Sequence, residues 1–379
     1  MVDKILLMIR LSHNCDLIVG LVFIWKRLIK QNIIFQVHQP LVINLVKTKM
    51  EPRIKERFDT DILHAIAARY STNKDSLCTL PGFMNLIYQC QIGNTQYILR
   101  ISHSSRRNVN LIQAECNWIT YLHENGLSVA YPVLSENNQF VETFIDNNGE
   151  YFLATLFIKA LGNHPAKPDL NTLFFKNYGR TIGKMHSLSK KYAPVNEVVR
   201  RPTWDDQIML DVARNISKSD EKILEKFNQL YKHLKTLPED KNSFGLIHQD
   251  PHTGNLFVDN KGQITLFDFD DCTYSWFIND IALVLFYVSM SSDKPESFIP
   301  EFFRHFYDGY LQENELSSDW FSEIHYFLKL RELDIYSLIY NNYDGQIASS
   351  QWAAHFMNNR KFRIEQDIPY IDFDFKKIV

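Results

Sequence analysis

The chain has 379 residues, of which 45% are hydrophobic and 22% are charged. These proportions are those of a globular protein with at least one large core, so extensive disorder is excluded. The formal net charge of −3 provides no overall electrostatic attraction to nucleic acid, and we expect no nucleic-acid partner.

The cysteines are scattered and odd in number: Cys15, Cys78, Cys90, Cys116 and Cys272. None of them forms a C-x-x-C pair. This argues against a disulfide framework or a zinc site, and it fits a reducing compartment. We therefore expect a cytoplasmic protein.

The first 49 residues differ in character from the rest. Residues 1–50 carry seven basic and two acidic residues, whereas the remainder is acidic. The apolar run Leu17–Trp25 is too short to cross a bilayer. Two interpretations remain open for residues 1–49: an amphipathic segment that associates with a membrane, or an extension that arises from an upstream start codon, with Met50 as the true start. We favour the second interpretation and expect this extension to be dispensable for folding.

The next segment shows the pattern of a β-hairpin followed by a helix. The strand-like runs Leu86–Gln91 and Tyr97–Ile101 flank a turn with Gly-Asn at its centre. A helix is predicted over Leu111–Asn125, and Gly126 stands at the expected stop position. These elements predict the start of a β-rich region.

A second hairpin is predicted at Gln139–Ile145 and Tyr151–Ile158, because Asp-Asn-Asn-Gly separates the two runs. After residue 162 the chain becomes mostly helical. The predicted helices are Phe174–Ser189, Asp220–Thr236 and the region from Asn279 to about Tyr343, with a β interruption over Gly245–Phe269. A β-rich part and a helical part joined near residues 158–162 predict an α+β protein with two lobes and a cleft between them.

The chemistry is concentrated in the β interruption. Two short strands meet at the turn Asp259–Gly262, which brings Asn255 and Asp268 to the same end of a hairpin, and Asp250 shortly precedes them. Oxygen ligands of this kind suit Mg²⁺. Phosphoryl transfer needs metal to offset phosphate charge and a carboxylate to orient the attacking hydroxyl. Asp250 fits the second role, and Asn255 with Asp268 fits the first.

Two other metal motifs fail on the residues present. His248 and His252 have the spacing of a zinc-protease helix, but Pro251 lies between them and Gln249 replaces the required Glu. A calcium loop opening at Asp268 would need Gly and Glu where the chain has Thr and Asn. A purely structural turn rich in Asp and Asn remains an alternative.

The pattern H-x-D-x-x-x-x-N, followed by apolar-D-F-D, resembles the aminoglycoside phosphotransferase and choline kinase superfamily. These proteins are relatives of protein kinases and include a type of homoserine kinase and a stress-response protein kinase. The resemblance implies that Asp250 is the catalytic base and that Asn255 and Asp268 bind Mg²⁺. It also implies that Asp280 braces the catalytic loop and that ATP is the co-substrate.

Upstream residues extend the resemblance, which covers about 55–345. Gly82 and Asn85 lie in a segment similar to the family's loop over the nucleotide phosphates. Arg100 matches the cationic strand residue that contacts the phosphates, and Glu115 is similar to the acid that pairs with it. The chain departs from the family pattern where Gln249 replaces the usual Gly and where Arg100 replaces the usual Lys, which exchanges a point charge for a planar fork.

Together these features predict a protein-kinase-like fold with an N-terminal extension over 1–49, a nucleotide-binding N-lobe over 51–158 and a catalytic, acceptor-binding C-lobe over 159–379. The predicted activity is transfer of the γ-phosphate of ATP to a hydroxyl of a small molecule, such as an amino alcohol, an aminoglycoside-like sugar or a hydroxy amino acid. A Ser/Thr protein kinase of the stress-response type and an inactive nucleotide-binding module are the alternatives.

Two features bear on the acceptor. Residues 300–379 carry thirteen acidic and eight basic residues, so an acidic wall that selects a cationic acceptor is expected. Its candidate members are Asp308, Glu332, Asp334 and Asp344. The segment Arg200–Asp206 is interpreted either as part of the acceptor pocket or as a helix cap.

Overall fold

The computed structural model describes residue 50 and residues 52–82, 84–166, 169–206, 212, 215–216, 220–290, 292, 295–341 and 351–378. All of them lie within one compact unit, Ile43–Val379. The predicted extension over 1–49 lies outside the described residues. Across the described ranges, no helix combines the length and the apolar character needed to cross a membrane.

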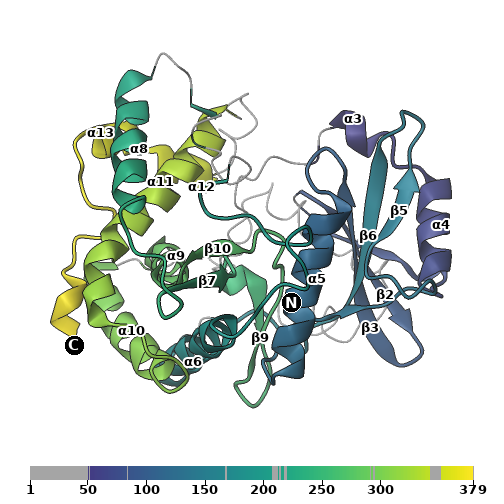
Figure 1. Ribbon diagram of the computed structural model, residues 1–379, viewed down its shortest axis with the longest axis horizontal. Helices are drawn as coiled ribbons and strands as arrows, with labels where there is room; N and C mark the ends of the chain where they lie inside the picture. Colours follow the sequence, from purple (N-terminus) through teal and green to yellow (C-terminus); the bar gives the residue numbers. More distant parts are fainter. Residues whose placement is uncertain are drawn as a thin grey trace, which may run out of the picture. The chain divides into compact units, whose positions relative to one another are not determined.

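The first part of the described chain is built on an antiparallel sheet. Its strands are β1 (Cys78–Leu80), β2 (Leu86–Ile92), β3 (Thr95–His103), β4 (Pro132–Val133), β5 (Glu142–Ile145) and β6 (Tyr151–Ile158). They are ordered β1-β2-β3-β6-β4, with β5 also paired to β6. The short helices α3 (Pro52–Lys55) and α4 (Thr60–Arg69) precede the sheet, and α4 packs against β5 (Figure 1).

Both predicted hairpins are confirmed, and glycine explains each turn. Gly93 has φ +60° between β2 and β3, and Gly149 has φ +79° between β5 and β6. This left-handed backbone is one that glycine adopts without a steric penalty. The turn at Gly93 sets the β2–β3 register that places Arg100 opposite Ile87, and pairing of β3 with β6 places Thr155 on the other side of Arg100.

Helix α5 (Val109–Glu124) joins the sheet to the rest of the fold. Asn108 caps its first turn by accepting from the Leu111 N–H, and Gly126, with φ +80°, follows its last turn as predicted. Trp118 of α5 is fully buried and meets Phe269 edge-on at 5.4 Å between ring centroids. The helix therefore packs directly against the segment that carries the predicted chemistry.

The second part is mainly helical. Its helices are α6 (Thr172–Ser189), α8 (Glu221–Leu234), α9 (Phe277–Met290), α10 (Pro295–Tyr310), α11 (Ile324–Asn341), α12 (Gln351–Met357) and α13 (Arg360–Glu365). Single turns of 3-10 helix lie at Lys74–Ser76, Thr253–Asn255 and Phe375–Ile378, and a longer one at Ser318–Glu323. Two ribbons of strand pairs interrupt the helices: β7 (Phe244–Ile247) with β10 (Thr273–Trp276), and β8 (Leu256–Val258) with β9 (Ile264–Leu266).

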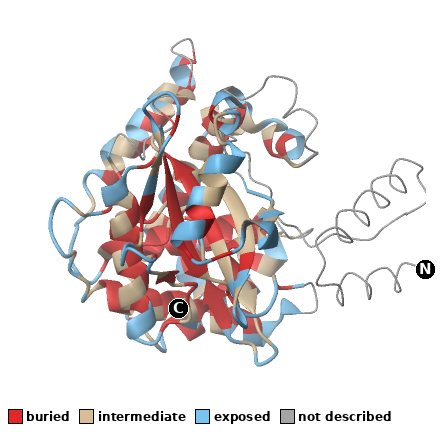
Figure 2. Cartoon of the chain, turned by 90° about the vertical axis from the view of Figure 1, so that its right-hand side faces the viewer, coloured by how far each residue is buried: buried red, intermediate tan, exposed pale blue. Residues whose placement is uncertain are grey.

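Helix α9 forms the centre of the helical part, since every residue from Phe277 to Ser289 is buried. Around it, α6 and α10 approach closely because Gly179 and Gly309 lack side chains; a Cβ on Gly179 would lie 1.7 Å from the Phe306 carbonyl oxygen. Figure 2 shows the buried residues concentrated along the strands and the inner helix faces. The predicted α+β architecture, with a β-rich first part and a helical second part, is confirmed.

Three cysteines of the described chain, Cys90, Cys116 and Cys272, are free and buried. They therefore belong to no disulfide framework, in agreement with the sequence expectation for these residues.

Candidate active site

The loop that follows β7 is held by a buried carboxylate. Asp280, in the first turn of α9, accepts hydrogen bonds from the backbone N–H groups of His248 (2.9 Å) and Gln249 (2.8 Å) and from His186 Nε2 (3.1 Å). Burial of Asp280 is complete. The predicted bracing role of Asp280 is therefore confirmed, and His186 is a structural residue of the same network.

Gln249 shows why this family position is usually glycine. Its φ is +69°, a conformation that costs a side-chain-bearing residue about 1–2 kcal/mol. The Asp280 bond to its N–H and the hydrogen bond from Asn279 Nδ2 to Gln249 Oε1 (3.0 Å) offset this cost. The substitution therefore preserves the loop conformation.

Asp250 lies at the end of this loop, buried, with both carboxylate oxygens engaged. Asn255 Nδ2 donates to Oδ2 at 3.2 Å and to the Asp250 backbone carbonyl at 2.9 Å. On the other side, Tyr287 OH (3.2 Å) and Arg331 Nη2 (2.8 Å) donate to Oδ1. The structure thus brings Asp250 and Asn255 together as the sequence predicted. It adds three partners that the sequence did not reveal: Tyr287, Arg331 and His252, whose Nε2 lies 3.4 Å from Oδ2.

Asn255 and Asp268 lie at the same end of the β8–β9 ribbon, also as predicted. Leu256 pairs with Leu266, and the Phe267 N–H donates to the Asn255 carbonyl at 3.0 Å. Asp268 follows with φ +63° and is exposed. Its negative charge reaches Arg100, where it raises the pKa of the guanidinium.

The donor set at this end of the ribbon is suited to a hard divalent cation. Because Asn255 Nδ2 is bound to Asp250, the amide oxygen Oδ1 is the atom that could bind a metal. Asp268 is exposed and directly follows Phe267, whose N–H is bound to the Asn255 carbonyl. These oxygens are the ligands that Mg²⁺ prefers when phosphates complete its coordination shell. The residues present therefore fit the expected metal.

Arg100 and Glu115 form the predicted ion pair between β3 and α5. Arg100 Nη1 and Nη2 donate to the two Glu115 oxygens at 2.7 and 2.6 Å, with both side chains buried. Burial opposes the charge on Arg100, but Glu115 and Asp270 outweigh it, so the pKa of Arg100 lies above its usual value. The bidentate geometry uses the planar fork that lysine lacks.

Gly82 and Asn85 lie in the turn between β1 and β2. A Cβ at Gly82 would lie 2.2 Å from the Asn85 carbonyl oxygen, so this tight turn requires glycine. Asn85 Oδ1 accepts from Ser102 at 2.8 Å, and its Nδ2 donates to Asp270 at 3.4 Å. The loop is therefore connected to the segment that carries Asp268.

Asp270 is the centre of a buried charge cluster that sequence reasoning missed. Its oxygens accept from Arg106 Nη1 at 2.7 Å and Arg107 Nε at 3.0 Å, and Arg100 lies 3.9 Å away. Burial opposes its ionisation, but these arginines outweigh that effect and hold the pKa of Asp270 well below its usual range. The adjacent arginines before α5, together with the second Asp of D-F-D, were the sequence signal for this cluster.

Replacing Asp270 with Asn is expected to destabilise the fold by about 3–5 kcal/mol, since it leaves buried guanidinium groups without their shared carboxylate. Urea unfolding of the variant measures this loss. Asp271→Asn is the matched control: Asp271 pairs with the same two arginines but its side chain is 26% exposed. A control loss of about 1 kcal/mol is expected. Equal losses in both variants would contradict the central role of Asp270.

The segment Arg200–Asp206, interpreted from the sequence as part of the acceptor pocket or as a helix cap, also contacts the Asp270 charge cluster in the structure. Arg201 donates to the backbone carbonyls of Asp270 (2.7 Å) and Cys272 (2.7 Å), which ties it to the same cluster. Trp204 instead lines a small cavity beside the catalytic loop. The segment therefore serves both the charge cluster and the cavity wall.

The small cavity, of about 40 Å³, is lined by residues of the catalytic loop, of α8, α9 and α11, and of the chain that precedes α8. They are Trp204, Val212, Phe227, Gln249, Asn279, Leu283, Leu330, Arg331 and Asp334. Apolar and polar groups both contribute. Because it borders Gln249, the neighbour of Asp250, it marks the side of the catalytic loop on which a candidate acceptor site would lie, but a volume of this size holds only a few water molecules.

The expected acidic wall is not formed by the candidates that the structure describes. Asp334 pairs with Arg331 at 2.7 Å and Glu332 pairs with Arg360 at 2.6 Å. Asp308 is exposed on α10, and Asp344 lies outside the described residues. Two of the four acids are thus neutralised by arginines that sequence spacing could not assign to them.

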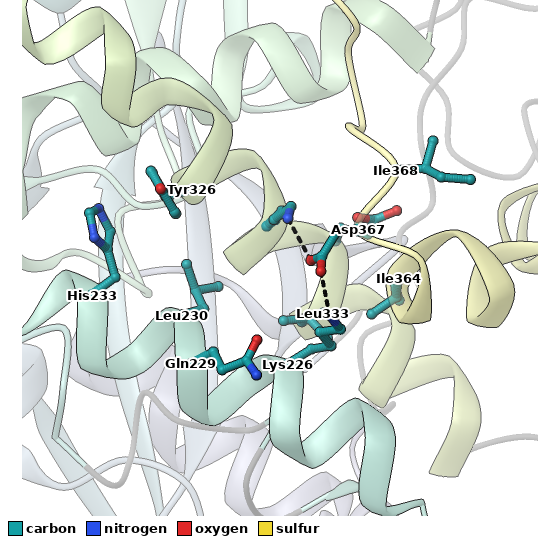
Figure 3. A pocket seen from close by; sticks show the side chains of 11 residues that line it. Lys226, Gln229, Leu230, His233, Tyr326, Leu333, Ile364, Asp367 and Ile368 are labelled. Carbon is teal, nitrogen blue, oxygen red and sulfur yellow. Dashed lines mark hydrogen bonds and ion pairs between the residues drawn. The ribbon is translucent and has the colours of Figure 1, made fainter.

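A larger cavity, of about 280 Å³, lies between α8, α11 and α13 (Figure 3). Asp367, at its edge, forms ion pairs with Lys226 and Lys329. Its lining contains none of Asp250, Asn255 and Asp268. Size alone therefore does not identify the candidate active site.

Comparison with known proteins agrees with this geometry. Residues 79–316 match the model of the phosphotransferase enzyme family, APH. The chain belongs to this family, and it is a kinase that acts on an alcohol group.

A particular relative is the amicoumacin kinase of Bacillus subtilis (strain 168). It is 36% identical over 331 residues, which cover 86% of this chain and 98% of the relative. Among solved structures, amicoumacin kinase hAmiN in complex with AMP-PNP, Ca²⁺ and Ami is 33% identical, with a TM-score of 0.82, and covers 87% of this chain and 100% of that one. A microcompartment-associated aminopropanol kinase, 18% identical with a TM-score of 0.66, covers 85% and 100% and supports the fold alone.

Proposed function

We propose that this kinase transfers the γ-phosphate of ATP to a hydroxyl group of amicoumacin or of a closely similar small molecule. The observation that carries the proposal is the Asp250 carboxylate, bound to Asn255 on one oxygen and to Arg331 and Tyr287 on the other, beside the small cavity. The identity to amicoumacin kinase over nearly its whole length supports the choice of acceptor.

In the proposed reaction, Asp250 orients the acceptor hydroxyl and accepts its proton. Asn255 and Asp268 would hold Mg²⁺, which would offset the negative charge of the phosphates. Arg100, held by Glu115, adds positive charge on the sheet side of the nucleotide, and the turn with Gly82 and Asn85 covers the phosphates. A fixed arrangement of charges of this kind stabilises the transition state without reorganisation.

A small-molecule acceptor is favoured over a protein acceptor. The support for this choice is the relative that the chain matches over 98% of the relative's length, a kinase named for the small molecule amicoumacin. Asp334 and Glu332 are paired with arginines, so their charges do not favour a cationic acceptor. Neutral hydroxyl compounds therefore belong among the candidate acceptors.

The test is a phosphorylation panel with the full chain and Mg-ATP. Amicoumacin, an amino alcohol, an aminoglycoside, a hydroxy amino acid and a generic Ser/Thr peptide are compared by kcat/KM, with products identified by mass. Amicoumacin is expected to exceed every other acceptor by at least about tenfold, or about 1.4 kcal/mol of transition-state preference. A peptide as the best acceptor would overturn the proposed substrate class.

A further inference from the structure

Helix α11 contributes a side chain that directly contacts the proposed catalytic carboxylate. We infer that Arg331 is a positioning residue for phosphoryl transfer, which orients Asp250 and links it to the small cavity beside Gln249. This inference rests on the proposed role of Asp250, since Arg331 acts through that carboxylate. The two residues lie 81 positions apart in the chain, and no sequence motif joins them.

The contacts of Arg331 use all three guanidinium nitrogens. Nη2 donates to Asp250 Oδ1 at 2.8 Å, Nε donates to Tyr287 OH at 2.9 Å, and Nη1 pairs with Asp334 at 2.7 Å. The guanidinium carbon lies 5.3 Å from the centre of the Tyr287 ring. The side chain is only 11% exposed, so these bonds lie in a largely water-excluded setting where charge is effective.

These contacts fix the plane of the Asp250 carboxylate. Asn255 holds Oδ2, with His252 Nε2 3.4 Å from the same oxygen, while Arg331 and Tyr287 hold Oδ1. Rotation of the carboxylate would break charge-assisted hydrogen bonds on both sides at once. Because a displacement of about 1 Å in a reacting group can lower a rate by about 100-fold, this restraint bears directly on transfer.

Arg331 also connects orientation with acceptor binding. Both Arg331 and its partner Asp334 line the cavity beside Gln249. An acceptor on this side of the catalytic loop therefore lies next to the same guanidinium that holds Asp250. The neighbouring residue on α11, Glu332, forms an equally short ion pair of 2.6 Å with Arg360 of α13, and both side chains have low exposure. Arg360 donates to Glu332 and to the Phe356 carbonyl, so it provides a matched ion pair away from the catalytic loop.

The experiment compares Arg331→Met and Arg331→Lys with the control Arg360→Met. Arg331→Met is expected to lower kcat by about 100-fold. This loss should appear both in transfer to the best acceptor of the panel and in Mg-ATP hydrolysis without acceptor. The Kd for AMP-PNP should stay within about twofold of wild type. Arg331→Lys should restore part of the rate, because lysine keeps the charge but not the fork. Arg360→Met is expected to lower the Tm and leave kcat within about threefold.

A double variant tests whether Arg331 acts on kcat through Asp250 or independently of it. In an Asp250→Asn background, Arg331→Met should lower kcat by less than about threefold further, because residues that act as a unit are not additive. A full second 100-fold loss, or equal kcat in Arg331→Met and Arg360→Met, would overturn the inference.

If Arg331→Met does not fold, Tyr287→Phe tests the same carboxylate oxygen without removing a charge. The expected loss in kcat is about tenfold. Wild-type kcat in Tyr287→Phe would then overturn the inference.

A structural measurement keeps the inference separate from the proposed function. Crystal structures of the wild type and of Arg331→Met, each with AMP-PNP, should show the Asp250 carboxylate rotated or in several orientations only in the variant. The crystal structure of Tyr287→Phe with AMP-PNP should likewise show a rotated or multiply oriented Asp250 carboxylate. An unchanged carboxylate in the variants would overturn the positioning role even if no acceptor were phosphorylated, whereas wild-type inactivity on every acceptor would contradict the proposed function alone.

Discussion

Asp250→Asn is expected to lower kcat by about 100- to 10,000-fold while Mg-ATP still binds with nearly wild-type affinity. The amide keeps the size of the side chain and can retain a contact with Asn255 or Arg331, but it cannot accept the acceptor proton. Steady-state kinetics gives kcat, and isothermal titration calorimetry gives the Kd for the Mg complex of AMP-PNP.

The control for Asp250→Asn is Asp308→Asn. Asp308 is an exposed acid on α10, so its replacement should leave kcat and the Kd unchanged. Wild-type turnover in the Asp250→Asn protein would contradict its role as the base. A parallel loss of nucleotide affinity would instead indicate that Asp250 acts mainly in binding.

The Asp268→Asn variant is expected to be impaired in nucleotide binding, which precedes phosphoryl transfer. Asp268 is proposed to bind Mg²⁺, so its loss should weaken nucleotide binding by at least about tenfold when Mg²⁺ is present and have little effect when it is absent. Asparagine is the appropriate replacement because Asp268 has φ +63°, a conformation that asparagine tolerates better than alanine does. The backbone therefore stays unstrained, and the ligand charge alone is removed.

Calorimetric titration with and without Mg²⁺ measures this difference. Asp268→Ala serves as a comparison, because it adds backbone strain to the same loss of charge. If Asp268→Asn binds the nucleotide as tightly as wild type in Mg²⁺, the proposed metal-binding role is wrong, while the role of Asp250 is unaffected.

The sequence determined the local parts of this protein. Glycine at 93 and 149 set the turns of the hairpins, and the Asp259–Gly262 turn brought Asn255 and Asp268 to one end of a ribbon. These features depend on residues within about twenty positions of one another. Spacing and turn chemistry are therefore sufficient to predict them.

Tertiary structure alone decided which distant charges meet. Asp270 binds Arg106 and Arg107 from more than 160 positions away, and Arg331 reaches Asp250 from a different helix. Several acids and arginines were equally available in the sequence, and local pattern carries no information on which pairs become buried together. Packing of α11 against α9, and of α5 against the Asp268–Asp271 segment, selected these partners. The expected acidic wall does not form for the same reason. Two of its candidate members, Asp334 and Glu332, are paired with Arg331 and Arg360.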